Sequence, residues 1–354
     1  MKKATIDIAS PKPAVSSLLI IYTGGTLGMS YDESGRHLVP FDFEHILKNM
    51  PELRQFEYKL TVLSLTHLID SSNMNPQIWI EITTIIGSEY AHYDGFVVLH
   101  GTDTMAYTAS ALSFLLENLS KPVILTGAQL PIGSVRTDAH RNLVTSIQIA
   151  AAQENGQPIV PEVCIFFNDV LLRGNRSRKV MSERFDAFYS ENYPKLARAG
   201  IDVDYNRSVI RAVPQDQTLC VHTRMDNRVA ILKLFPGISE AVVRCMLENQ
   251  NLKAFILETY GSGNAPTESW FVEALEQATQ RGVLIYNVSQ CLGGQVEQGR
   301  YATSKELLRI GVISGHDITT EAAVSKLMFL LGQNLPLSEI KTQLSRSIRG
   351  EMSP

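Results

Sequence analysis

The 354-residue sequence has few of the features that direct a protein toward metals, disulfide bonds, nucleic acids or membranes. Its only cysteines are Cys164, Cys220, Cys245 and Cys291, with no CxxC pair and no histidine at ligand spacing. We therefore expect structural thiols, no metal site and no disulfide framework. The formal net charge is only -4 and no basic block is present, so nucleic-acid binding is not expected. No apolar run approaches the roughly 20 residues that span a membrane.

The amino terminus also lacks the pattern of a secretory signal. Lys2 and Lys3 are followed by Asp7 and Pro11, and no apolar stretch of secretory length precedes Leu18. We therefore expect a cytoplasmic protein.

The apolar runs that the chain does have alternate with helix-like segments. Short runs bounded by turn residues are typical of buried strands, and this alternation is typical of parallel strands joined by helices. The order predicts a doubly wound α/β domain with a mostly parallel sheet. Strands are predicted at Leu18–Tyr22, Lys59–Thr66, Gly95–His100, Val123–Ala128 and Val163–Val170, and helices at Phe41–Asn49, Pro76–Glu89, Thr104–Glu117 and Asp138–Ala152.

The alternation is lost around Pro214, and a second, smaller α/β pattern follows. Its strands are predicted near Val229–Leu234, Ala254–Glu258 and Val283–Val288, and its helices near Ser239–Asn249, Glu268–Gln280, Lys305–Ile310 and Glu321–Leu331. We therefore expect an N-terminal extension over residues 1–16, a larger domain over 17–204, a linker over 205–221 and a C-terminal α/β domain over 222–354.

Hydroxyl-rich loops follow several of the predicted strands. The sequence TGGT at residues 23–26 follows the first strand, and GTDT at residues 101–104 follows the third. Each is an ordinary turn when taken alone, and so are the Asp-Ser-Ser segment at 70–72 and the lone Lys179. The carboxyl ends of parallel strands meet at one edge of a sheet, where ligands bind. We therefore expect the four segments to share a crevice, with His100 packed or hydrogen-bonded rather than acting as a base.

These residue types suit nucleophilic catalysis by a threonine. A hydroxyl is a weak nucleophile unless a base lies beside it and the developing oxyanion is stabilised. Lys179 is a candidate to take a proton from Thr102, with Asp103 orienting the lysine; Thr26 is the alternative attacking group, in which case Thr102 activates water. The pattern predicts acyl transfer from a small amide to water and leaves open which threonine forms the covalent bond. The segment that suits an ammonium and a carboxylate is Asp70, Ser71 and Ser72.

Longer motifs connect these loops to a known family. HGTDTMAYTA at residues 100–109 extends the second loop, and further segments read TGAQ at 126–129, RGNR at 173–176, GSGN at 261–264 and DITTEA at 317–322. Together with TGGT, they resemble the bacterial-type L-asparaginases, and most of all their cytoplasmic type I branch. The matches run from the first strand nearly to the end of the chain.

The resemblance implies hydrolysis of L-asparagine to L-aspartate and ammonia without a cofactor, by a homodimer or a dimer of dimers. It places the nucleophile of the mobile loop on Thr26 and the lysine on Lys179. Tyr301 is a candidate to complete the site of a partner subunit. The second threonine and its aspartate fall on Thr102 and Asp103, which also join the substrate-binding residues Asp70, Ser71 and Ser72.

Two positions depart from the family pattern. Ser177-Arg178 stands where the segment before the lysine usually reads Thr-Thr, and Glu258 stands where some type I enzymes carry an arginine of an effector site for asparagine. These departures argue against effector control. The alternatives that remain are a mixed glutaminase-asparaginase and an asparagine sensor without turnover. The related subunit of transfer-RNA amidation carries an added amino-terminal domain, for which the start of TGGT at Thr23 leaves no room.

Overall fold

The computed structural model describes residues 4–8, 13–31, 38–40, 46, 50–299 and 302–353. The chain divides into two compact units, Met1–Thr223 and Arg224–Pro354. Residues 205–221, the expected linker, belong to the first unit. Most of the helix predicted at Phe41–Asn49, and also Tyr301, lie outside the described residues.

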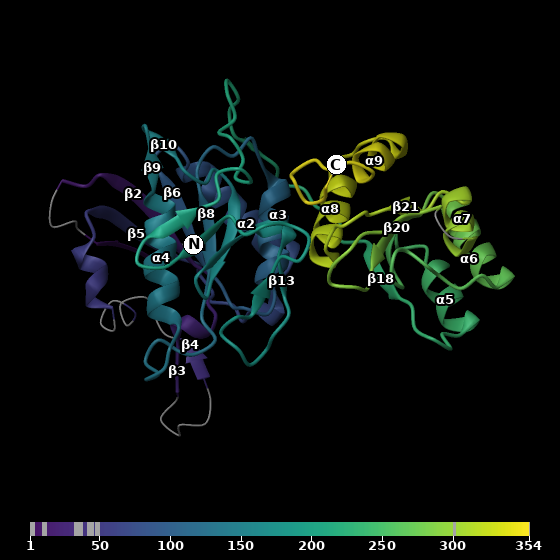
Figure 1. The fold of residues 1–354 in the computed structure, drawn as a ribbon, viewed down its shortest axis with the longest axis horizontal. Helices are drawn as coiled ribbons and strands as arrows, with labels where there is room; N and C mark the ends of the chain where they lie inside the picture. Colours follow the sequence, from purple (N-terminus) through teal and green to yellow (C-terminus); the bar gives the residue numbers. More distant parts are fainter. Residues whose placement is uncertain are drawn as a thin grey trace. The chain divides into compact units, whose positions relative to one another are not determined.

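A nine-stranded mixed sheet forms the centre of the first unit (Figure 1). The strands β5, β2, β6, β8 and β11 are parallel neighbours, and antiparallel strands flank them. The chain reverses its direction of winding between β2 and β6, so this is the doubly wound fold that the alternation predicted. In spatial order the strands are β1 (Ala4–Ile8), β5 (Tyr58–Ser64), β2 (Ser16–Tyr22), β6 (Gly95–Leu99), β8 (Val123–Thr126), β11 (Val163–Phe167), β12 (Val170–Arg173), β15 (Ala197–Ala199) and β16 (Val203–Tyr205).

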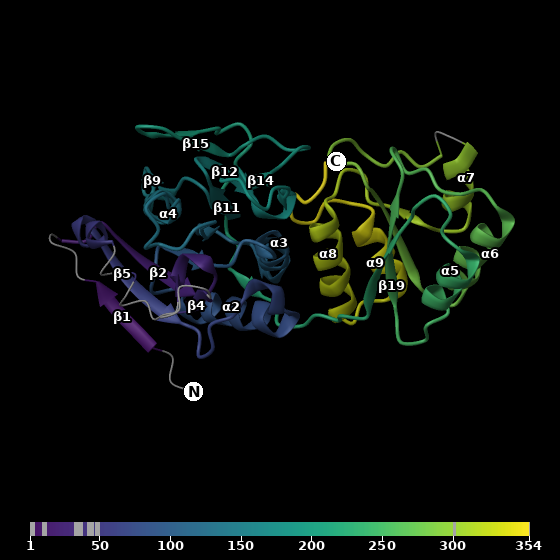
Figure 2. The same cartoon turned by 90° about the horizontal axis from the view of Figure 1, so that it is seen from below.

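Helices cover both faces of this sheet (Figure 2). Successive side chains of a strand point to opposite faces. Accordingly, Ile20 of β2 packs in one core cluster with Leu143, whereas Ile21 packs in another with Ile86 and Met105. The helices are α2 (Pro76–Glu89), α3 (Met105–Leu115) and α4 (Ala139–Ala151). Burial of β2 on both faces explains its continuous apolar run.

One predicted strand is two strands in the structure. The apolar run from Val163 was expected to continue to Val170, but β11 ends at Phe167 and β12 returns antiparallel to it. Asn168 and Asp169 connect them with φ angles of 43° and 66°. Asparagine and aspartate tolerate this left-handed conformation, which suits a tight hairpin turn.

Four two-stranded sheets complete the described part of the first unit. Lys179 lies on one of them, in a strand too short to be recognised from the sequence. Another joins the end of the 205–221 segment to the end of α3. The pairs are β3 (Met29–Tyr31) with β4 (Leu38–Pro40), β7 (Leu116–Glu117) with β17 (Cys220–Val221), β9 (Gln153–Glu154) with β10 (Gln157–Pro158), and β13 (Arg178–Lys179) with β14 (Phe188–Tyr189).

The second unit contains a four-stranded parallel sheet, which confirms the smaller α/β pattern. Its strands are β18 (Val229–Lys233), β19 (Ala254–Thr259), β20 (Leu284–Ser289) and β21 (Ile313–Ser314). Its helices are α5 (Glu240–Leu247), α6 (Ser269–Gln280), α7 (Ala302–Arg309), α8 (Thr320–Gly332) and α9 (Leu337–Leu344), of which α9 was not predicted. The side chains of Lys326 and Glu351 form a fully buried ion pair in this unit, with Nζ and Oε1 2.7 Å apart.

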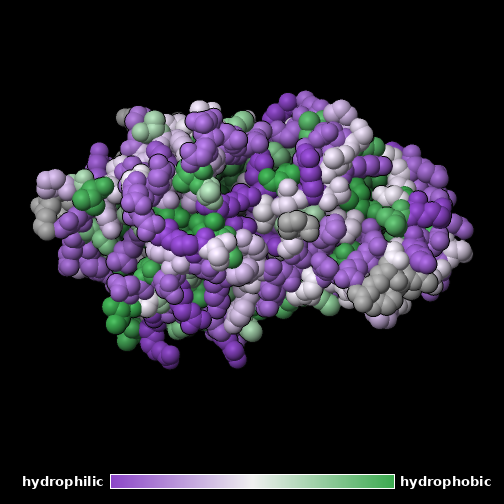
Figure 3. Space-filling model, turned by 45° about the horizontal axis from the view of Figure 1, so that its top comes forward, coloured by the Kyte–Doolittle hydropathy of each residue, from purple (hydrophilic) through white to green (hydrophobic). Residues whose placement is uncertain are grey.

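The face of the molecule shown in Figure 3 carries hydrophilic side chains with hydrophobic areas scattered between them. No helix in the described part of the chain is both long and apolar enough to cross a membrane.

Candidate functional site

The loops after β2 and β6 meet through glycines on either side of the switch between these two strands. A Cβ atom on Gly25 would lie 2.4 Å from the backbone nitrogen of Gly101, and one on Gly24 would lie 2.4 Å from the carbonyl oxygen of Ile69. Both glycines have positive φ angles, 122° at Gly24 and 91° at Gly25. Close approach and left-handed backbone both require glycine here. Because Gly25 touches Gly101, the residues that follow them, Thr26 and Thr102, stand at adjoining loops.

The loop after β5, which carries Asp70, Ser71 and Ser72, contacts the loop after β6. A Cβ on Gly101 would lie 2.6 Å from Oγ of Ser71, which is itself buried. The hydroxyl of Thr104 donates to the carbonyl oxygen of Ser71 at 2.7 Å. Thr104 is the residue that precedes α3, and its hydroxyl makes no capping bond to that helix but connects two loops instead. Asp70 is exposed and accepts hydrogen bonds from both the backbone N–H and the hydroxyl of Ser72, each at 2.9 Å.

Lys179 contacts both Thr102 and Asp103 in the loop after β6. Its Nζ lies 2.7 Å from Oγ1 of Thr102 and 2.7 Å from Oδ1 of Asp103. The lysine side chain is 15% exposed, whereas that of Asp103 is 66% exposed, so the lysine reaches the buried Thr102 from a sheltered position. A hydroxyl, an amine and a carboxylate are thus in hydrogen-bond contact, and these are types of group that can act as nucleophile, base and orienting group. The helix α3 begins three residues after Thr102, so the positive end of its dipole favours negative charge nearby.

The site contains Gln129, the last residue of the TGAQ motif, for which the sequence predicted no role. Thr102 donates its hydroxyl hydrogen to Oε1 of Gln129 at 3.2 Å. The amide nitrogen of Gln129 donates to the carbonyl oxygens of Ser182 and Arg184, at 3.1 and 2.9 Å, which fixes the direction of the amide. Its position in the sequence could have identified it, because Gln129 follows β8 as closely as Thr102 follows β6.

His100 is packed and hydrogen-bonded, as expected. It is buried, and burial lowers its pKa from 6.5 to about 4, against the opposing effect of the Gly101 carbonyl. Nδ1 lies 2.6 Å from that carbonyl oxygen, so Nδ1 carries the proton and Nε2 accepts from the hydroxyl of Thr108 at 2.8 Å. Thr108 in turn accepts from the indole N–H of Trp79 at 2.9 Å. This chain of bonds holds the peptide that precedes Thr102.

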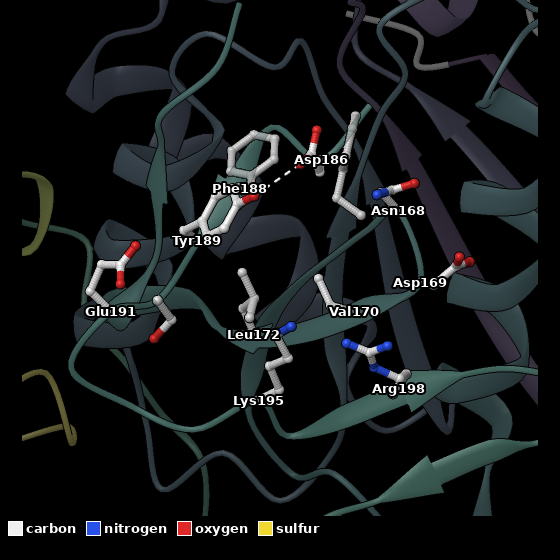
Figure 4. Close-up of a pocket in the computed structure, with 12 residues that line it drawn as sticks. Asn168, Asp169, Val170, Leu172, Asp186, Phe188, Tyr189, Glu191, Lys195 and Arg198 are labelled. Atoms are coloured by element: carbon white, nitrogen blue, oxygen red, sulfur yellow. Dashed lines mark hydrogen bonds between the residues drawn. The ribbon is translucent and has the colours of Figure 1, made fainter. Parts of the chain in front are cut away.

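A separate pocket of about 420 Å³ lies beside β11, β12 and β14 (Figure 4). Phe188 of β14, which contributes to its lining, pairs with Lys179 in the neighbouring strand. Apolar side chains such as Leu172 line it together with charges of both signs, including Lys195 and Asp186. None of the predicted site residues contributes to this lining, so the pocket has no assigned part in the chemistry.

The carboxylate of Glu258 contacts two side chains of the second unit. It accepts a hydrogen bond from the hydroxyl of Thr320 at 2.6 Å, and its other oxygen lies 3.3 Å from Nζ of Lys233. A buried carboxylate with these contacts repels the carboxylate of an amino-acid effector, where an arginine would attract it.

Known proteins share this architecture and much of this sequence. The sequence matches the family described as "Asparaginase, N-terminal" over residues 17–211 and the family "Glutaminase/Asparaginase C-terminal domain" over residues 228–344. L-asparaginase 1 of Escherichia coli (strain K12) is 44% identical over 340 residues, which cover 96% of this chain and 98% of that protein.

Two other comparisons agree with this match. The crystal structure of L-asparaginase I from Vibrio cholerae is 42% identical, with a TM-score of 0.87 over 96% of this chain and 100% of that one. A glutamyl-tRNA(Gln) amidotransferase subunit of Pyrococcus abyssi is 33% identical, over 97% of this chain and 78% of that protein. The chain therefore belongs to the asparaginase family.

Proposed function

We propose that this chain hydrolyses L-asparagine to L-aspartate and ammonia through a threonyl ester intermediate. L-asparaginase activity is supported by the similarity to L-asparaginase 1 over nearly the full length of both proteins. The observation that carries the mechanism is the contact of Lys179 with both Thr102 and Asp103. The reaction needs no cofactor, because hydroxyl, amine and carboxylate supply the nucleophile, the proton transfers and the orientation.

The chemical steps balance with these groups alone. A threonine oxygen attacks the side-chain amide carbon, and its proton passes by way of Nζ of Lys179 to the leaving nitrogen. The C–N bond breaks, ammonia leaves, and an aspartyl ester remains. Water then attacks the ester, the C–O bond to threonine breaks, and L-aspartate is released with the hydroxyl restored. The α3 N-terminus and Gln129 flank the region where the oxyanion develops.

Two threonines compete for the role of nucleophile. Lys179 directly contacts Thr102, whereas the family resemblance favours Thr26 on the glycine loop. Intact-protein mass spectrometry after rapid mixing with L-asparagine separates the two. If Thr26 attacks and Thr102 activates water, Thr102→Ala accumulates an aspartyl ester on Thr26. If Thr102 attacks, the ester accumulates in Thr26→Ala and maps to Thr102.

The substrate-binding residues are part of the same proposal. The exposed carboxylates of Asp70 and Asp103 suit the substrate ammonium, and the loop of Ser71 and Ser72 suits its carboxylate. Changing Asp70 to Asn is expected to raise KM more than it lowers kcat, because this contact is made before and during the reaction.

The primary test is ammonia release from L-asparagine over a wide concentration range, with L-glutamine in parallel. Turnover of asparagine alone supports an asparaginase, and equal turnover of both amides supports the mixed glutaminase-asparaginase. Binding without ammonia from either amide supports the sensor and overturns the proposal. The surroundings of Glu258 favour a hyperbolic curve, whereas a sigmoidal curve would show that an effector site exists elsewhere.

We also propose a cytoplasmic homodimer or dimer of dimers, as the family resemblance implies. Light scattering on the purified chain measures the mass directly. A monomer with full activity would exclude a partner's contribution to the site, including one from Tyr301.

A further inference from the structure

One cluster of metal-ligand side chains lies outside the site described above. Glu117, Cys220 and His222 each offer one ligand atom, and these atoms lie within 4.8 Å of one another. In the part of the chain that the structure describes, it is the one group of three such side chains at this spacing. The cluster belongs entirely to the first unit. It is separated from Thr102 by α3, whose 11 residues span about 16 Å.

The backbone places all three side chains on one face of the β7–β17 pair. Cys220 lies directly opposite Glu117 in the antiparallel register. His222 lies two residues beyond Cys220, and its N–H continues the ladder by donating to the carbonyl oxygen of Leu115 at 2.9 Å. Side chains two residues apart point to the same face of a strand. The cluster therefore follows from the register rather than from flexible surface side chains.

The opposite face of the same pair is fixed against the protein core. Leu116 is buried, and Val221 packs against the core cluster that contains α2 and α3. A Cβ on Gly87 of α2 would lie 2.8 Å from a methyl carbon of Val221. The strands that carry the cluster are thus held firmly from behind, while Cys220 remains exposed and the side chains of Glu117 and His222 are 35% and 22% exposed.

The distances fit a small tetrahedral cation. Nε2 of His222 lies 2.8 Å from Oε2 of Glu117 and 3.7 Å from Sγ of Cys220. Zn²⁺ bonds to sulfur, nitrogen and oxygen at their usual lengths place tetrahedral ligands about 3.4–3.6 Å from one another. The sulfur–nitrogen separation exceeds this range by about 0.1 Å, and the nitrogen–oxygen separation needs to open by about 0.6 Å.

The donor types and charges also suit zinc. A thiolate, a neutral imidazole and a carboxylate are the three kinds of protein ligand that Zn²⁺ uses, and their charges sum with the ion to zero. We propose that Glu117, Cys220 and His222 form a Zn²⁺ site, with water in the fourth position. Binding removes the proton from the thiol and displaces the proton that Nε2 donates to Glu117, so that Nε2 offers its lone pair and the neutral imidazole carries its proton on Nδ1. The ion ties the strand that ends the first unit to the segment that follows α3.

The proposed site can be tested directly with Co²⁺, which substitutes for zinc and gives a spectroscopic signal. The untagged, full-length chain is reduced, freed of metal and titrated with Co²⁺. We expect one ion per chain, a near-ultraviolet thiolate-to-cobalt charge-transfer band, and its displacement by Zn²⁺. Cys220→Ser loses the band, and Cys220→Ser and His222→Gln weaken Zn²⁺ binding by at least about tenfold, since even the loss of an outer partner costs this much.

Matched controls come from the same chain. Cys245→Ser removes another exposed thiol, and His92→Gln removes an exposed histidine that lies 3.3 Å from Glu89 without a thiol nearby. Both keep the band and the affinity of the parent. Absence of the band in the parent, or its persistence in Cys220→Ser, overturns the proposal.

If a variant cannot be titrated with Co²⁺, the effect of Zn²⁺ on its Tm provides a second test. Zn²⁺ raises the Tm of the parent and of Cys245→Ser, and leaves that of Cys220→Ala unchanged, because only a folded site binds the ion. Equal shifts in all three overturn the site. These measurements contain no turnover, so their outcome is independent of the proposed asparaginase activity.

Discussion

Nζ of Lys179 lies 2.7 Å from Oγ1 of Thr102, although the two residues are 77 positions apart in the chain. This contact predicts that the pair acts as a unit. Lys179→Met is expected to lower kcat by about 10²–10⁴ with a much smaller change in KM, because proton transfer is lost while substrate contacts remain. Lys59→Met, which removes an exposed lysine from β5, serves as the control and keeps the parent kcat.

If Thr102 and Lys179 act together, their substitutions should lower kcat non-additively. Thr102→Ala should abolish turnover with the fold intact, and Thr102→Ala with Lys179→Met should be no slower than Thr102→Ala alone. Steady-state kinetics and circular dichroism on the three variants check this. Near-normal turnover of Thr102→Ala, or a rise in KM alone for Lys179→Met, would remove these residues from the chemistry.

Gly25→Ala is expected to disrupt the junction of the loops after β2 and β6. The new Cβ would lie 2.4 Å from the Gly101 nitrogen, and the φ angle of 91° disfavours any side chain. This backbone conformation, with a ψ angle of 170°, is adopted almost only by glycine and alone costs another residue about 1–3 kcal/mol. We expect turnover to fall steeply, since the shift moves both threonines. Gly133→Ala, where a Cβ would meet nothing within 4 Å, should leave turnover unchanged; equal effects of the two substitutions would contradict the prediction.

His100 predicts a pH dependence of stability. Its pKa is about 4 when folded and 6.5 in the unfolded chain, so the unfolded state binds more protons between these values. The histidine's contribution is complete above pH 6.5 and is lost progressively as the pH falls to about 4, roughly 3 kcal/mol in all. Urea unfolding of the parent and of His100→Gln between about pH 4 and pH 6.5 measures the contribution of His100 to the free energy of unfolding. The free-energy difference between them should shrink on acidification, and a constant difference would contradict the assignment.

The buried ion pair of the second unit predicts a large stability loss. Lys326 and Glu351 are both fully buried, and Glu351 also accepts hydrogen bonds from the backbone N–H groups of Ile348 and Arg349. Lys326→Met leaves a buried carboxylate without its cation, which costs about 3–5 kcal/mol. Thermal or urea unfolding measures the loss. Arg309→Met, which breaks exposed pairs only, should change little.

Some features could not be predicted because they depend on turns. The strand expected to end at Val170 reverses at Asn168 and Asp169, and the apolar pattern of β11 and β12 continues through the turn. Contacts between loops set a second limit: the start of a helix at Thr104 was predicted to within one residue, but its hydroxyl donates to Ser71, a residue of another loop.

The sequence by itself determined the parallel strands at the centre of the first unit, the glycine loops and the types of residue at the strand ends, because periodic burial and positive φ angles are local constraints. Only the tertiary structure decided which of these residues touch. Gln129 orients Thr102, His100 bonds to Thr108, and Glu117 meets Cys220 through the register of two short strands. Such contacts depend on the register and twist of distant segments within ångströms, and no local pattern of side chains carries that information.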